Sequence, residues 1–114
     1  MRIMVTGGRE FNNYAIAKTA LEKYLTQTDT LVHGGCRGCD LLCAKVASEI
    51  GAKVEEHKAD WNKYGRAAGP IRNREMLESG IDLVIAFPGG KGTNNAIKTS
   101  RAFGIPVVKI AQHE

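Results

Sequence analysis

The sequence predicts a three-layer α/β/α fold built on a five-stranded parallel sheet. Short apolar runs alternate along the chain with longer patterns of helical period, and glycine, proline or aspartate separates nearly every pair of segments. Such alternation is typical of right-handed βαβ units, which place helices on both faces of a parallel sheet. A third observation, glycine at the end of three predicted strands, marks the end of the sheet where a ligand is expected.

Four strands are predicted from short apolar runs, partly β-branched, as buried parallel strands are. They cover residues 2–6, 30–33, 82–87 and 105–110. A further run over residues 53–57 is more polar and is expected at an edge of the sheet. The predicted strand order is then 3-2-1-4-5, a Rossmann-like order whose switch point lies between the first and fourth strands.

Four helices are predicted between the strands from apolar residues that recur every three or four positions. The first carries an apolar stripe from Ala17 to Leu25, and the second covers Cys39–Ile50. The third and fourth are predicted over residues 70–79 and 94–103.

Helix boundaries are predicted from capping residues. Asn12 or Asn13 is expected to cap the start of the first helix, because short polar side chains accept hydrogen bonds from free N–H groups there. Gly51, Gly80 and Gly104 each follow a predicted helix and are expected in the left-handed conformation that ends it.

The length and composition predict one globular domain over residues 1–114. The chain is 43% hydrophobic and 25% charged, and its net charge of +4 favours anionic partners. No apolar run is long enough to cross a membrane, and the N-terminus lacks the pattern of a signal peptide, so a soluble cytoplasmic protein is expected. Three cysteines close together do not form a disulfide framework.

Three glycine-rich loops follow predicted strands and are expected to meet at one end of the sheet. They are Thr6-Gly7-Gly8-Arg9, Gly34-Gly35-Cys36-Arg37-Gly38 and Pro88-Gly89-Gly90-Lys91-Gly92-Thr93. Glycine lets the backbone approach a ligand, and the last two loops lead into helices whose free N–H groups attract phosphate. Thr93 is expected to cap its helix or to turn its hydroxyl to a phosphate. The spacing of a Walker loop is absent, so ATP hydrolysis is not indicated.

Cationic side chains in these loops are candidates for phosphate contacts, since the arginine fork suits bidentate binding. The candidates are Arg9, Arg37, Arg72 and Lys91. Arg66 and Arg74 are expected to be solvated surface charges.

The connection over residues 60–69 is long for a strand–helix link and contains Trp61. Two interpretations stay open. In the first, the segment is a lid whose indole stacks on a base. In the second, the aromatic side chain closes the end of the sheet.

Motifs along nearly the whole chain resemble the SLOG superfamily, a Rossmann-like group that includes the DNA-processing protein A and LOG families. The matching segments are residues 5–11, 33–40, 59–61, 69–73 and 86–93. Within the group, the chain is most similar to the small YspA/YpsA-related branch, whose function is unknown. The resemblance implies a nucleotide or nucleotide-derived ligand at the glycine loops, with Asp40 and Asn73 among the binding residues.

One departure from the LOG enzymes bears on catalysis. Their Pro-Gly-Gly-x-Gly-Thr-x-x-Glu motif resembles this chain from Pro88 to Thr93, and their arginine is similar to Arg72, but Ala96 stands where they have the glutamate. A methyl group performs no acid–base chemistry. Asp40 or Glu75 could replace the carboxylate, but nothing in the spacing requires it. Binding without a catalytic residue is therefore expected.

The cysteines have a spacing that invites a metal site. His33, Cys36, Cys39 and Cys43 lie within eleven residues. However, Cys39 and Cys43 fall on the apolar stripe of their helix, where cysteine behaves as a small hydrophobe. We therefore expect neither a metal nor another cofactor, and expect His33 to be a hydrogen-bonding or core residue.

Three functions remain open, and the first is favoured. It is a module that senses or sequesters a phosphate-bearing nucleotide ligand. The second is a LOG-type N-glycosidase acting on nucleoside monophosphates. The third is single-stranded nucleic-acid binding like that of DNA-processing protein A, which the modest charge makes less favoured. A dimer or larger oligomer is also expected, since so small a sheet leaves apolar helix surface exposed.

Overall fold

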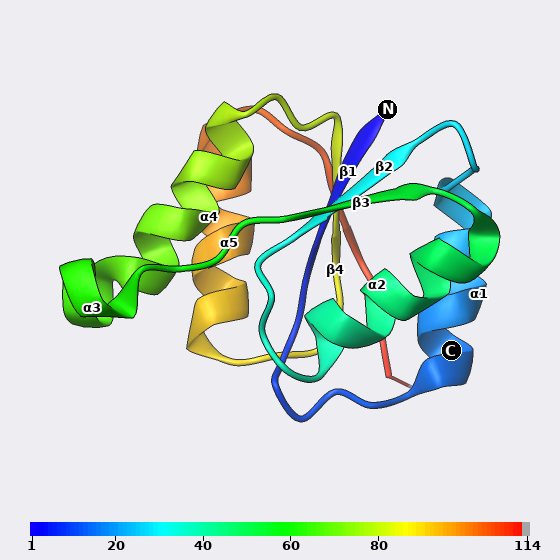
Figure 1. The fold of residues 1–114 in the computed structure, drawn as a ribbon, viewed down its shortest axis with the longest axis horizontal. Helices are drawn as coiled ribbons and strands as arrows, with labels where there is room; N and C mark the ends of the chain where they lie inside the picture. Colours follow the sequence, from blue (N-terminus) through cyan, green and yellow to red (C-terminus); the bar gives the residue numbers. More distant parts are fainter. Residues whose placement is uncertain (113–114) are drawn as a thin grey trace.

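The parallel sheet predicted from the sequence is present in the structure, a computed structural model that describes residues 1–112. Its strands are β1 (Arg2–Thr6), β2 (Thr30–His33), β3 (Lys53–Glu56), β4 (Leu83–Ala86) and β5 (Val107–Lys109). The order is β3-β2-β1-β4-β5 and every pairing is parallel. Both the Rossmann-like class and the strand order are thus confirmed, and the switch point lies between β1 and β4 (Figure 1).

Helices cover both faces of the sheet. Figure 1 shows α1 (Tyr14–Tyr24) and α2 (Cys39–Ile50) on one face, with α4 (Ala68–Glu78) and α5 (Lys91–Ala102) on the other. The short helix α3 (Trp61–Tyr64) and a 3₁₀ turn, η1 (Gly65–Ala67), precede α4. No helix in the described part of the chain is long and apolar enough to cross a bilayer.

Side chains of β1 alternate between two hydrophobic cores. Ile3 and Val5 pack with α1 and α2, whereas Met4 packs on the opposite face with Met76 of α4 and Ala96 of α5. All five are at most 2% exposed. This period of two explains why the central strands read as continuous apolar runs: each face of the sheet is buried under helices.

The predicted helix boundaries are mostly confirmed. Asn13 caps α1, its side-chain oxygen accepting from the Ile16 N–H at 3.1 Å. Gly51, Gly80 and Gly104 have φ of +94°, +98° and +73°, the left-handed conformation expected after a helix.

Two boundaries differ from the prediction. The segment over residues 60–69 is helical rather than a loop, because Asp60 caps α3 and the chain then continues through η1 into α4. Helix α5 begins at Lys91 instead of residue 94, with Gly90 at its N-cap position. Thr93 therefore lies inside the first turn and does not cap the helix, contrary to one of the two roles predicted for it.

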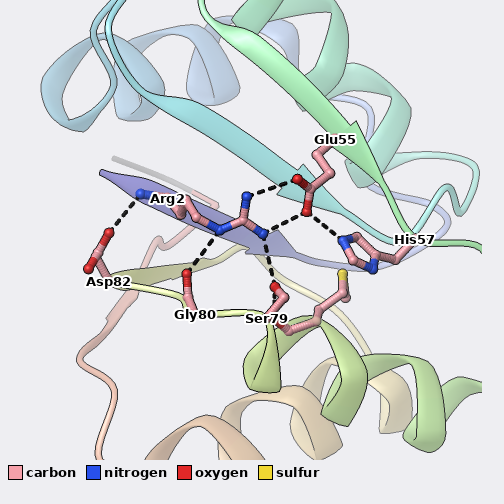
Figure 2. Close-up of polar contacts among 7 residues, drawn as sticks. Arg2, Glu55, His57, Ser79, Gly80 and Asp82 are labelled. Carbon is pink, nitrogen blue, oxygen red and sulfur yellow. Dashed lines mark hydrogen bonds and ion pairs between the residues drawn. The ribbon is translucent and has the colours of Figure 1, made fainter.

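An ionic cluster joins β1, β3 and the end of α4 (Figure 2). The Arg2 guanidinium donates to both carboxylate oxygens of Glu55 at 2.8 and 2.6 Å, and to the Ser79 hydroxyl and the Gly80 carbonyl at 2.9 and 3.0 Å. His57 Nε2 lies 2.6 Å from Glu55. Hydrogen bonds from Arg2, and then from His57, lower the pKa of Glu55 to about 2.

We expect Glu55→Gln to lower the free energy of unfolding by about 1 kcal/mol at pH 7, since the side chains of Arg2 and Glu55 are 30% and 38% exposed to solvent. Because the folded-state pKa lies below the usual value, the stabilisation is present above about pH 4.5 and is lost as the pH falls toward 2. Urea unfolding of both proteins at pH 7 and pH 3 tests this. The difference should shrink at pH 3, and Glu78→Gln, which removes an exposed i,i+4 pair with Arg74, should have little effect at either pH.

Candidate functional site

The main cavity lies at the carboxyl ends of β1 and β4, beside the switch point. Its volume is about 470 Å³. Its lining comprises Val5, Thr6, Gly7, Gly8, Arg9, Cys36, Asp40, Trp61, Arg66, Gly69, Pro70, Arg72, Asn73, Met76, Gly90, Lys91, Gly92, Thr93 and Asn95. This is where open α/β sheets usually bind ligands, and the size falls within the range of small-molecule sites.

The start of α5 provides backbone donors at one side of the main cavity. Within residues 1–112, the N–H groups of Lys91, Gly92 and Thr93 have no protein acceptor, as expected for the first turn of a helix. The Gly90 N-cap carries no side chain to satisfy them. The positive end of the helix dipole therefore points free N–H groups toward the cavity, an arrangement that favours an anion.

Two threonine hydroxyls of the main cavity also lack partners. Thr6, at the end of β1, is 9% exposed, and Thr93, in the first turn of α5, is 5% exposed. Neither hydroxyl forms a hydrogen bond with any residue that the structure describes. No buried side-chain oxygen within the described residues lacks a partner, so these two unpaired hydroxyls are accessible from the cavity and available to a bound molecule.

The main cavity has a cationic lining. Arg9, Arg66, Arg72 and Lys91 contribute to it, and Asp40 is the one carboxylate among its lining residues. Arg66 is exposed, as predicted, and it also lines the cavity from η1, a turn that sequence periodicity did not predict.

The second glycine loop is held by Asp40, which is 6% exposed. One carboxylate oxygen of Asp40 accepts from the Gly34 N–H at 3.1 Å and the Cys36 N–H at 3.2 Å. The Gly35 N–H donates to His33 Nδ1 at 3.0 Å. Protein acceptors therefore occupy these three backbone N–H groups of the second loop.

Burial of Asp40 has the largest effect on its ionisation. Removal from water raises the pKa of this carboxyl, while the bonds from the loop and the nearby His33 and Arg72 act in the opposite direction. Burial likewise lowers the pKa of His33, which is 2% exposed. Both side chains therefore serve first as internal supports of the loop.

Arg72 connects α4 to the second glycine loop. Its Nη1 donates to the Gly34 carbonyl at 2.7 Å and its Nε to the Asn73 side chain at 3.0 Å. Asn73 in turn donates to Asn95 at 3.2 Å, which lines the main cavity from α5. Arg72 thus combines a structural role with a position in the cavity wall.

Several predicted site residues do not line the main cavity. Pro88 and Gly89 support the first loop instead: the Pro88 carbonyl accepts from the Gly8 N–H at 2.8 Å, and a Cβ at Gly89 would collide with the Thr93 hydroxyl. Gly38 has φ of +80° and packs against the Arg9 carbonyl. Its role is conformational, since only glycine adopts this backbone easily.

A smaller side cavity of about 310 Å³ lies against the second loop. Gly34, Gly35, Arg37 and Ala59 line it, and it shares Arg9, Cys36, Trp61 and Arg72 with the main cavity. Gly34, Gly35 and Arg37, which were predicted to bind the ligand, therefore line the side cavity and do not line the main cavity beside α5.

Trp61 lies on α3 and is 49% exposed. It lines both cavities and approaches Gly69, where an added Cβ would meet the indole at 3.4 Å. The indole is thus part of a helical rim and not of a loop lid. Its flat face remains available for stacking, which keeps it a candidate for base contact.

The three positions considered for a catalytic carboxylate lie in different surroundings. Ala96 is fully buried in the core beside Met76, and Glu75 is exposed and does not line the main cavity. Asp40 alone among the considered carboxylates reaches that cavity.

Two of the three cysteines are core residues, as their position on the apolar stripe predicted. Cys39 and Cys43 are fully buried with sulfur atoms 3.9 Å apart, and their contact and burial raise the pKa of Cys39. Cys36 is half-buried and contacts Arg72. No cluster of possible metal ligands is found within the described residues, and the absence of a bound metal stays a prediction.

Sequence and structure comparisons agree with this architecture. Gene 61 protein of Mycobacterium phage D29 is 35% identical over 117 residues, covering 94% of each protein. The X-ray structure of TM1055, a structural genomics target, has a TM-score of 0.69 at 19% identity, over 93% of this chain and 71% of that chain. The C-terminal domain of PF1911 hydrogenase from Pyrococcus furiosus has a TM-score of 0.55 at 16% identity, over 96% and 89%. At such identities the structural likeness concerns the fold alone.

The family comparison addresses the resemblance seen in the motifs. The model of the YspA, cpYpsA-related SLOG family matches residues 1–64, which is more than half of the chain. The matched region includes the first two glycine loops and Asp40. The chain belongs to the YspA, cpYpsA-related SLOG family.

Proposed function

We propose that this protein binds a nucleotide or nucleotide-derived molecule in the main cavity, with a phosphate at the start of α5. One observation carries the proposal: free N–H groups of Lys91, Gly92 and Thr93 and the unpaired hydroxyls of Thr6 and Thr93 line the same cavity. Phosphate oxygens accept from both kinds of donor. The surrounding arginines and Lys91 supply the balancing charge.

Other lining residues of the cavity suit the nucleoside. Trp61 and Pro70 provide aromatic and apolar surface. A base stacked on the exposed indole would keep its polar edge in water while its phosphate reaches α5. A site of this kind supports a module that senses or sequesters its ligand.

A binding experiment tests the proposal directly. Titration calorimetry with adenosine and guanosine 5′-monophosphate, with inorganic phosphate as reference, should give saturable one-to-one binding for a nucleotide that is tighter than for phosphate. Oligonucleotides titrated at low and moderate salt serve as the comparison. Tight binding that grows with oligonucleotide length would favour the nucleic-acid function instead. Self-association stays a prediction, which sedimentation at micromolar concentration tests.

LOG-type hydrolysis is the second function, and the place of Asp40 in the cavity is the observation that favours it. A carboxyl with a raised pKa can act as a general acid or base. Against this, Asp40 already binds two backbone N–H groups, and Ala96 lies in the core. We therefore expect binding without turnover.

Wild-type protein is accordingly expected to release no free base from adenosine or guanosine monophosphate during prolonged incubation. Chromatographic detection of the base measures this. Release by wild type that Asp40→Asn stops and Glu75→Gln does not stop would establish Asp40 as a relocated carboxylate, and the protein would then be a hydrolase. Asn retains an oxygen that can accept from the loop, which limits the structural effect of this variant.

A further inference from the structure

The side cavity is a second cationic compartment, which shares two arginines with the main cavity and has one arginine of its own. Arg37 lines the side cavity only, while Arg9 and Arg72 line both cavities. No carboxylate is among the residues that line the side cavity. The positive charge of the side cavity therefore favours the binding of a second anionic group there.

Arginine side chains provide free donors in this compartment. The N–H groups of Gly34, Gly35 and Cys36 are occupied by Asp40 and His33. By contrast, Arg9 forms no ion pair or side-chain hydrogen bond with any residue in 1–112, and Arg72 Nη2 contacts only the Cys36 sulfur, at 3.9 Å. These guanidinium groups keep free N–H groups for an anion.

Arg37 is only weakly engaged within the protein. Its Nη2 pairs with Glu10 at 3.0 Å, but the two side chains are 72% and 90% exposed. Such an exposed pair contributes little and competes weakly with a ligand. Arg37 is thus free to contribute to binding without loss of internal support.

The two anion positions are separated by a strand. The side-cavity loop follows β2 and the α5 start follows β4, with β1 between them in the sheet. Neighbouring strands lie about 4.8 Å apart, so these loops originate about 10 Å apart. A single bridging oxygen of a diphosphate chain is too short to span them, whereas a sugar or a second nucleotide is long enough.

We infer that the natural ligand carries two separate anionic groups, one at the start of α5 and one among Arg9, Arg37 and Arg72. This inference rests on the proposed function and narrows it. The chemistry is that of a nucleotide with phosphates on different positions of the sugar, or of a cyclic dinucleotide, in which the sugars separate two phosphates. Trp61, which lines both cavities, borders the sugar or base between the two groups.

Calorimetry with matched nucleotides tests the inference. For adenosine and for guanosine, the ligands are the 5′-monophosphate, the 5′-diphosphate, the 3′,5′-bisphosphate and the cyclic 3′,5′-linked dinucleotide. We expect the bisphosphate or the dinucleotide to bind at least about tenfold more tightly than the monophosphate, and the 5′-diphosphate to gain less. Comparison of the bisphosphate with the dinucleotide identifies which of these ligands supplies the second anionic group.

Two variants assign the gain to the side cavity. Arg37→Glu should reduce the ratio of bisphosphate or dinucleotide affinity to monophosphate affinity by at least about fivefold. Lys98→Glu makes the same charge change on α5 at an exposed position that lines neither cavity, and should leave the ratio unchanged. Thermal melting verifies that both variants are folded.

The outcomes separate the inference from the proposed function. If monophosphates bind but no two-anion ligand gains affinity, or if the gain survives Arg37→Glu, the inference is wrong and the proposed function stands. An equal gain for the 5′-diphosphate also contradicts it. If no nucleotide of any kind binds, the proposed function itself fails.

Discussion

Gly90→Val is expected to abolish binding of adenosine or guanosine monophosphate while the protein stays folded. A Cβ at Gly90 would meet no protein atom within 4 Å, and its φ of −106° lies outside the left-handed region. The added side chain would therefore occupy the mouth of the main cavity, beside the free N–H groups of α5. Thermal melting should show a loss of stability smaller than the roughly 2–5 kcal/mol of a core truncation.

A graded series makes this expectation specific. Gly90→Ala should weaken binding less than Gly90→Val, because a methyl group fills less of the space that a phosphate needs. Gly89→Val is the contrasting variant: its Cβ would collide with the Thr93 hydroxyl and would lie 2.7 Å from the Gly8 nitrogen, so folding itself should suffer. Unchanged nucleotide affinity in folded Gly90→Val would contradict a phosphate site at α5.

The difference between these adjacent glycines also shows what the sequence could not predict. Gly89 and Gly90 look equivalent in the Pro88–Thr93 segment, yet one packs against the protein and the other borders the cavity. The distinction depends on how the first loop approaches from β1, which is a tertiary contact. The fold, by contrast, could be predicted, because each buried strand and each capped helix carries a local signal.

Site residues outside the loops were missed for a related reason. Arg66 and Asn95 line the main cavity, but the first depends on the turn of the chain through η1 and the second on the early start of α5. Gly92, in the first turn of α5, has a low helix propensity. In the first turn its cost is tolerated, because the N–H groups have no intrahelical acceptor in any case. Asn95 could have been found by placing it one turn after Lys91.

The second loop illustrates a limit of motif reasoning. The segment from His33 to Asp40 has the pattern of a glycine loop before a helix, which often binds phosphate. Nothing in that spacing tells whether the acidic residue of the first turn binds the loop itself. In the structure Asp40 does so, and the positive charge beside this loop comes from Arg37 of the loop and Arg72 of α4, which both line the side cavity.

Arg72→Ala is expected to weaken nucleotide binding by about 1–3 kcal/mol, or roughly 5- to 150-fold, through loss of charge-assisted hydrogen bonds. Its stability should fall by about 1 kcal/mol, because the bond from Nη1 to the Gly34 carbonyl is also lost. Arg72→Lys retains the charge without the planar fork, so it should restore only part of the affinity. Calorimetry and urea unfolding measure the two effects separately.

Gly34→Ala should reproduce part of this loss by a different route. The guanidinium of Arg72 lies directly over Gly34, so an added Cβ would displace it without straining the backbone. In the Arg72→Ala background no guanidinium remains to be displaced, and Gly34→Ala should then have little further effect on binding. The two losses are therefore expected to be clearly less than additive in a double-mutant cycle, as for residues in direct contact. Strict additivity would mean that Gly34 affects the ligand independently of Arg72, and the second loop would then have to contact it directly.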